Sequence, residues 1–195
     1  PQKCNISLLG CCLMIVSGRR LAEIMNQKSK FKPKDKYAVE FDGQLKKRDK
    51  TAHSYSIPLL VESQTFCNAF DVLKKKQSNT TRNASNDEVT ALYQGNLTRQ
   101  LKISFPIFQH IHVFRSFYAS AVYEAFDMNM TFNRCTMLCL GHDSLHESLS
   151  YNNVKLEGFD RHQKTFGNLS QIAPSKSILR STNEESHNHS HQLFQ

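Results

Sequence analysis

The sequence predicts a mainly α-helical fold, or an α+β fold, built as a small helical bundle around one long phenylalanine-rich helix. Leu, Ile, Val and Phe supply 49 of the 195 residues. That fraction lies above the roughly 20% below which chains tend to stay disordered. With 13 Phe and no Trp, the predicted core is filled mostly by phenylalanine. The third observation is an apolar stripe of helical period from Ser104 to about Met128, wide enough to be buried on more than one side.

Four parts follow one another along the chain. Residues 1–18 are predicted to form a signal-like or anchor-like apolar segment, and residues 19–53 a basic linker with room for a short β-hairpin. Residues 54–167 are predicted to form the helix-rich domain, and residues 168–195 a polar, disordered tail. No apolar run reaches the roughly 18 residues that a membrane-spanning helix requires.

The N-terminal segment has the composition of a secretory signal. Lys3 precedes an apolar run from Ile6 to Val16, and the small residues Ser17 and Gly18 follow it. A positive start, a short apolar stretch and small residues at its end are typical of a signal peptide. A buried helix or strand has the same length and polarity, so this alternative stays open.

The net charge of +8 belongs entirely to the first half of the chain. Its densest part predicts an anion-binding stretch made of nine cations: Lys28, Lys30, Lys32, Lys34, Lys36, Lys46, Lys47, Arg48 and Lys50. Such a stretch favours a protein partner or an anionic glycan or membrane surface, with nucleic acid as the alternative. Lys outnumbers Arg here, which weakens the case for nucleic acid because Arg makes the bidentate contacts. A solvated loop would carry the same charges.

Strand signals come before the helices. Residues 37–41 alternate apolar and polar side chains, and Asp42-Gly43 is a hairpin-type turn. Residues 55–61 predict a strand that Pro58 confines to the edge of a sheet. Phe66, Phe70 and Leu73 then recur at helical spacing.

Three helices are predicted further along. Asn86 is predicted to cap the first, and Ser104 to cap the long Phe-rich helix with Pro106 in its first turn. A last helix is expected from Cys135 to Leu149, where Gly141 is a potential break.

Acceptor triplets for N-glycans exceed the roughly two that chance predicts. After Asn5 is set aside because it borders the apolar run, six predicted glycosylation sites remain: Asn79, Asn83, Asn96, Asn129, Asn168 and Asn188. This excess favours a secreted or ER-lumenal glycoprotein.

Cysteine and histidine spacing gives one candidate metal site. Cys135, Cys139, His142 and His146 are zinc-type ligands that share one face of a helix. The same face continues through leucines, so a buried apolar face explains the pattern as well. A disulfide from Cys67 to Cys135 or Cys139 is predicted as a supplement to the core.

Three functions are compatible with these observations. The first is a secreted or ER-lumenal N-glycosylated binding protein without catalytic activity. The alternative is a basic intracellular nucleic-acid-binding protein, located in the nucleus and stabilised by zinc. The third is a metal-dependent hydrolase around His142 and His146, although the order His142-Asp143 differs from the metalloprotease pattern, which needs Glu after the first His.

Overall fold

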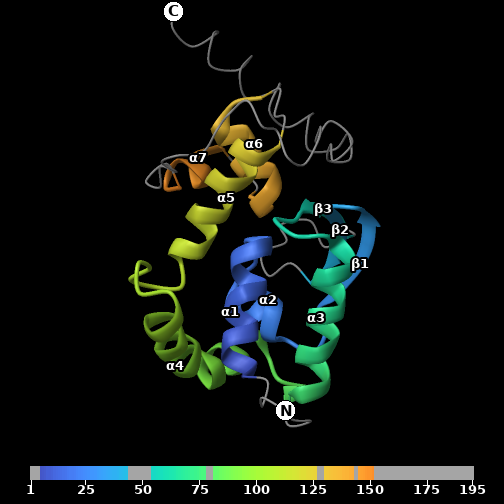
Figure 1. Cartoon of the computed structure of the whole chain (residues 1–195), viewed down its shortest axis with the longest axis vertical. Coiled ribbons are helices and arrows are strands. Elements are labelled where there is room, and N and C mark those ends of the chain that lie inside the picture. The colour runs from blue at the N-terminus through green and yellow to red at the C-terminus, as the bar shows by residue number, and fades with distance from the viewer. Residues whose placement is uncertain (1–4, 44–53, 78–80, 127–129, 143–144, 152–195) are drawn as a thin grey trace, which may run out of the picture.

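The computed structural model describes residues 5–43, 54–77, 81–126, 130–142 and 145–151. These residues form a mainly helical molecule with one small antiparallel sheet, as predicted. Helix α1 (Ile6–Ser17) lies at the centre, with α4 (Asn86–Ser104) and α3 (Ser63–Lys76) on either side, as Figure 1 shows. Helices α5 (Val113–Ala125), α6 (Phe132–Leu140) and α7 (Leu145–Leu149) gather at one end of the molecule. Among the described helices, none is both long and apolar enough to cross a membrane.

Helix α1 is the central core element, and the prediction of a signal or anchor segment over residues 1–18 is wrong. Asn5 caps its first turn by accepting hydrogen bonds from the Ser7 and Leu8 amides. Cys11, which is 0% exposed, belongs to a buried core cluster that also contains side chains of α3, α4 and the sheet. Burial in a folded core satisfies the same apolar run that a signal peptide would carry.

The helix ends at Gly18, whose φ of 63° lies in the left-handed region that glycine favours. A Cβ atom at this position would lie 2.2 Å from Cδ1 of Tyr118, so the backbone approaches the tyrosine ring closely. The chain then turns sharply into the short helix α2 (Leu21–Met25). The α1–α2 corner is therefore fixed by both conformation and packing.

Residues 19–53 are predicted as a basic linker with room for a short β-hairpin, and their described part forms α2 and two strands. Strands β1 (Lys30–Asp35), β2 (Ala38–Asp42) and β3 (Tyr55–Pro58) pair antiparallel in the order β1-β2-β3. A hairpin forms between β1 and β2, but it turns at residues 36–37 and not at the predicted Asp42-Gly43. Phe31 lies opposite Phe41, and their rings stack 4.6 Å apart. The prediction of an edge strand containing Pro58 is confirmed, because β3 pairs with β2 alone in this sheet.

Helices α3 and α4 confirm the helical spacing seen in the sequence. Phe66 and Phe70 of α3 pack on Phe31, which attaches the helix to the sheet. Helix α4 starts one residue earlier than predicted, with Ser85 as its cap and Glu88 completing a reciprocal capping box.

The long helix predicted from Ser104 is wrong. Ser104 is the last residue of α4, and Phe105 leaves the helical region at φ −138° because it precedes a proline. Turns follow, in which Phe105 and Phe108 pack edge-on against Phe114. Helix α5 begins only at Val113.

The last predicted helix is also divided. Helix α6 ends at Gly141, which adopts φ 66°, and α7 begins at Leu145. Gly141 therefore acts as the predicted break. The resulting turn changes the direction of the chain at His142, whose ring is buried.

Candidate active site

Three segments that are far apart in sequence meet at the end of the molecule where α5, α6 and α7 gather. They are the α1–α2 corner, the first turn of α5 and the segment that follows α6. Arg115 of α5 joins them: its Nη1 donates to the Gly18 carbonyl at 2.7 Å and its Nη2 lies 3.2 Å from His142 Nε2. Its Nε donates to the Tyr151 hydroxyl at 3.3 Å. The side chain is 2% exposed, so this guanidinium is held from several sides in a buried position.

The adjacent residues Arg19 and Arg20 have different environments. Arg19 is 0% exposed, and its guanidinium donates to the Ser17 carbonyl, the Tyr55 hydroxyl and the Cys139 carbonyl. Those partners use most of its donors, so Arg19 connects α1, β3 and α6. Arg20 is partly exposed, and among the described residues its guanidinium has the Glu23 carboxylate, at 3.0 Å, as its hydrogen-bond partner. Arg20 thus keeps donors available for a ligand.

Tyr151, His142 and His112 complete the site. The rings of His142 and Tyr151 lie 5.0 Å apart, and Arg115 lies over the Tyr151 ring at 5.8 Å. His142 Nδ1 lies 3.2 Å from the hydroxyl of Ser148. His112 is exposed at the start of α5, one helical turn before Arg115.

The electrostatics of the site favour an anion. Within the described residues, the guanidinium groups of Arg19, Arg20 and Arg115 interact with one carboxylate, that of Glu23. Burial raises the pKa of this carboxyl, but Arg19, Arg115 and Arg20 outweigh burial and hold the pKa below its usual value. The three positive charges therefore exceed the single negative charge, and a phosphate or carboxylate would balance the difference.

The pKa values of Arg115 and His112 reflect the same excess. Burial lowers the pKa of Arg115, and the nearby Arg19 and Arg20 lower it further. Desolvation lowers the pKa of His112, and Arg115, Arg20 and His110 add to the effect. His112 is therefore neutral at pH 7, with a nitrogen lone pair available to accept a proton.

The predicted zinc ligands do not form one cluster. The Sγ atoms of Cys135 and Cys139 lie 3.8 Å apart in the core below the site, whereas His142 contacts Arg115 and Ser148. His146 is exposed on α7. The residues that the structure describes contain no group of three or more His, Cys, Asp or Glu side chains arranged to hold a metal ion.

The predicted disulfide is absent from the structure, in which Cys67, Cys135 and Cys139 are free thiols. Cys67 lies on α3, with its Sγ 4.0 Å from the Phe31 carbonyl oxygen. Of the glycan acceptors, Asn83 and Asn96 are exposed. Asn79, Asn129, Asn168 and Asn188 lie outside the described residues, as do Lys46, Lys47, Arg48 and Lys50.

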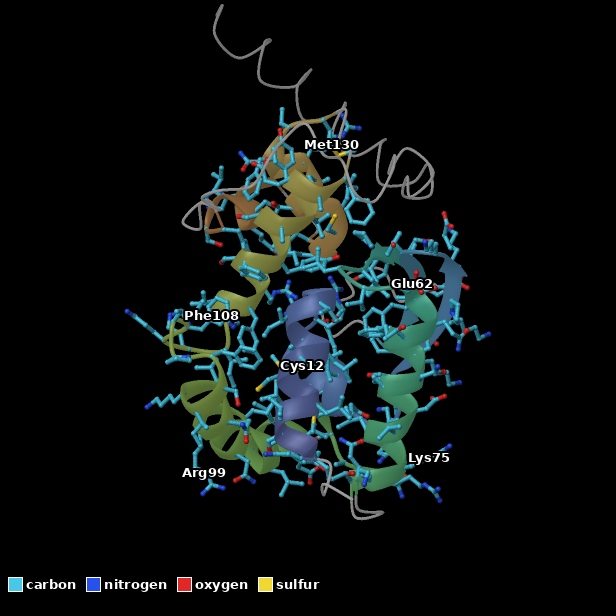
Figure 2. All side chains as sticks on the ribbon, viewed as in Figure 1. Cys12, Glu62, Lys75, Arg99, Phe108 and Met130 are labelled. Carbon is cyan, nitrogen blue, oxygen red and sulfur yellow. The ribbon has the colours of Figure 1, made fainter. Side chains whose placement is uncertain are left out.

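The described part of the predicted anion-binding stretch carries acidic residues among its lysines. Lys30 and Lys32 on β1 lie opposite Asp42 and Glu40 on β2. Lys36 forms an ion pair with Glu62 at 3.4 Å. A second basic group, made of Lys74, Lys75 and Lys76 at the end of α3, lies far from the site. Figure 2 shows Lys75 at the end of the molecule opposite Met130. The stretch as a whole stays a prediction.

The sequence reasoning missed Arg20, Arg115 and Tyr151. A signal for Arg115 was present, because it falls within the apolar stripe of its own helix, between Ile111 and Tyr118. A charged side chain at such a position predicts burial and therefore a partner. Arg20 and Tyr151 have no comparable local pattern, since each acquires its role from contacts across the fold.

Known proteins resemble this chain over most of its length. Residues 2–153 match the family model of the telomere resolvase ResT/TelK catalytic domain. The protelomerase of Escherichia phage N15 is 31% identical over 174 residues, a match that covers 78% of this chain and 27% of that protein. The chain thus spans about a quarter of the length of this curated relative.

Two solved structures share the fold. A variant of protelomerase TelA covalently complexed with substrate DNA superimposes with a TM-score of 0.70 at 23% identity, over 78% of this chain and 54% of that chain. Protelomerase TelK complexed with substrate DNA gives a TM-score of 0.68 at 26% identity, over 90% of this chain and 36% of that chain.

These matches correct the main functional prediction. A secreted, N-glycosylated binding protein without catalytic activity is wrong, because the matched family model describes a catalytic domain and covers the supposed signal segment. The expected locations, secreted or ER-lumenal with the nucleus as the alternative, are wrong as well. The curated relative comes from a virus of bacteria, which have neither compartment.

The family model covers more than half of the sequence, including Arg20, Arg115, His142 and Tyr151. The chain belongs to the family of telomere resolvase ResT/TelK catalytic domains.

Proposed function

We propose that this chain is the catalytic part of an enzyme that cleaves and rejoins DNA strands, with Tyr151 as the nucleophile. The observation that carries the proposal is the contact of 3.3 Å between Arg115 Nε and the Tyr151 hydroxyl, in a site with surplus positive charge. The charged Arg115 donor holds the proposed attacking oxygen in position by a hydrogen bond. The same charge attracts the phosphodiester that this oxygen would attack.

The chemical step is a transesterification. The Tyr151 oxygen forms a bond to the phosphorus of the DNA backbone, and the bond from phosphorus to one neighbouring nucleotide oxygen breaks. The phenol proton ends on that leaving oxygen, so one strand end carries a hydroxyl and the other is joined to the protein. A DNA hydroxyl then attacks the phosphotyrosyl bond and restores both the phosphodiester and the phenol. Because each step exchanges one ester for another, no energy source is consumed.

The other side chains of the site stabilise and transfer charge in this step. Arg20 presents guanidinium donors to the phosphate oxygens, whose charge increases as the attacking oxygen bonds, and Arg115 adds its positive charge beside the attacking oxygen. Neutral His112 can take the phenol proton, and its exposed position leaves it accessible to a bound strand. Arg19 instead connects the surrounding elements through its contacts with the Ser17 carbonyl, the Tyr55 hydroxyl and the Cys139 carbonyl.

The relatives support DNA as the substrate. The TelA structures are described as covalently complexed with substrate DNA and, in another variant, as complexed with a DNA hairpin product. This chain spans 54% of the TelA chain and 36% of the TelK chain, so recognition of a particular DNA sequence is proposed to involve further parts of the protein.

A trapping experiment tests the proposal. The full chain is incubated with a labelled library of randomised DNA duplexes, and SDS is added to stop the reaction and unfold the protein. Label that stays with the protein on a denaturing gel reveals a covalent adduct. We expect an adduct from the wild type and none from Tyr151→Phe, which lacks only the attacking oxygen. Tyr93→Phe on α4 is the matched control, and an adduct from Tyr151→Phe as strong as the wild type's would refute the proposal.

A further inference from the structure

We infer that Ser148 is a positioning residue that holds the His142 ring in place and thereby sets the orientation of Arg115. This inference rests on the proposed function, because it concerns the same site. The supporting contacts form one chain: Ser148 Oγ lies 3.2 Å from His142 Nδ1, and His142 Nε2 lies 3.2 Å from Arg115 Nη2. Ser148 is 0% exposed and His142 is 6% exposed, so water has little access to the ring.

The direction of these hydrogen bonds follows from the chemistry of the partners. A guanidinium has donors and no acceptor, so the His142 nitrogen that faces Arg115 must accept. In a neutral imidazole the proton is then on the other nitrogen, Nδ1. Ser148 is the partner at Nδ1, and its hydroxyl oxygen can accept that proton. The contacts therefore define one tautomer, with the proton on Nδ1 and the lone pair on Nε2.

The tautomer matters because of what it does to Arg115. With a lone pair on Nε2, the ring holds Nη2 of the guanidinium, and Nε stays directed at the Tyr151 hydroxyl. The opposite tautomer would place an N–H against the Arg115 N–H groups and push the guanidinium away. Ser148 thus acts on the proposed nucleophile through two intermediate side chains, without touching the substrate.

The sequence offers a matched pair of serines for the test. Ser148 is buried against His142, whereas Ser150, two residues later, is exposed and its hydroxyl donates to the Glu147 carbonyl at 3.0 Å. Ser148→Ala removes the acceptor for Nδ1–H, and Ser150→Ala removes a hydroxyl from the same end of α7 without reaching the histidine. Ser148→Thr keeps a hydroxyl at the critical position.

The first measurement is the ¹⁵N NMR spectrum of histidine-labelled full chain, with His142 assigned by its absence in His142→Gln. Protonated and unprotonated ring nitrogens differ clearly in shift. We expect the wild type and Ser150→Ala to carry the proton on Nδ1, and Ser148→Ala to show a shifted Nδ1 signal because Nδ1–H has lost its acceptor. A wild-type ring protonated on Nε2, or on both nitrogens at pH 7.5, overturns the inference even if Ser148→Ala does not fold.

The second measurement is the rate of DNA adduct formation at saturating DNA, together with DNA affinity. Loss of the partner that orients a metal-ligating histidine typically costs about 10–100-fold in metal affinity or activity, and we take the lower end, about 10-fold, for the His142 ring. We expect that loss in Ser148→Ala, recovery in Ser148→Thr, and unchanged affinity in both. A wild-type rate in Ser148→Ala refutes the positioning role and leaves the proposed function standing, whereas an adduct from Tyr151→Phe refutes the proposed function and leaves the ¹⁵N result interpretable.

Discussion

Replacement of Arg115 by lysine tests the central contact of the site. Lys keeps one positive charge but provides a single ammonium group, which cannot reproduce the fork that reaches the Gly18 carbonyl at 2.7 Å and the Tyr151 hydroxyl at 3.3 Å. We therefore expect Arg115→Lys to lose both the anchoring of the α1–α2 corner and the hydrogen bond to the Tyr151 hydroxyl. The two losses appear in different measurements.

The magnitudes follow from the burial of the contacts. A buried carbonyl left without its partner costs about 1–3 kcal/mol, so we expect a decrease of that size in the free energy of unfolding, measured by urea titration. Removal of one preorganised donor from a reacting site costs about 2.7–4 kcal/mol, or roughly 10²–10³ in rate. The rate of adduct formation at saturating DNA, measured in a single turnover, should fall by that factor.

Arg99→Lys on the exposed surface of α4 is the control for this substitution. We expect it to retain both the stability and the rate of the wild type, because its guanidinium makes one exposed hydrogen bond, to Asn96 at 3.5 Å. Arg115→Lys with the wild-type rate would refute the proposed role of the contact between Arg115 and Tyr151.

Three further predictions concern the fold and its titration. Gly18→Ala should lower the free energy of unfolding by about 2–4 kcal/mol, because the new Cβ would lie 2.2 Å from the Tyr118 ring at a φ of 63°. Gly95→Ala is the control and should raise the free energy of unfolding by about 0.5–1 kcal/mol, because nothing lies within 4 Å of its new Cβ. Equal effects of the two substitutions in urea titrations would contradict this prediction. Burial lowers the pKa of Lys74 to about 8 from an ordinary value of 10.5, so the unfolded chain binds more protons than the folded chain between these pH values. The stability of the wild type relative to Lys74→Met should therefore rise as pH rises from about 8 to 10.5. A difference in urea midpoint that stays flat or falls over this range would refute the prediction. An NMR titration should give His112 a pKa below 6.5, and a value above 6.5 would show that desolvation and the neighbouring cations do not control this ring.

Local patterns in the sequence predicted the elements whose structure depends on residues close together in the sequence. The spacing of Phe66 and Phe70 predicted α3, and Pro58 predicted an edge strand, because both effects depend on the backbone of a few residues. The same approach failed between Ser104 and Val113. There the apolar stripe continued across Pro106, although the residue before a proline disfavours the helical region.

The candidate site was harder to predict because its members meet across the whole chain. Arg115 and Gly18, joined by one hydrogen bond, are 97 residues apart. The spacing of His142 after Cys135 and Cys139 predicts a candidate metal site on one helical face. In the structure the helix ends at Gly141, and the ring of His142 contacts Arg115 instead. The apolar run of α1 suits a signal peptide and a buried helix equally well, since both exclude polar side chains.

The most direct test of the account is identification of the atom that joins protein and DNA. The trapped adduct is digested with nuclease and protease, and tandem mass spectrometry locates the peptide that retains a nucleotide. The account predicts a phosphodiester between the nucleotide and the phenol oxygen of Tyr151. A nucleotide on any other side chain would contradict it.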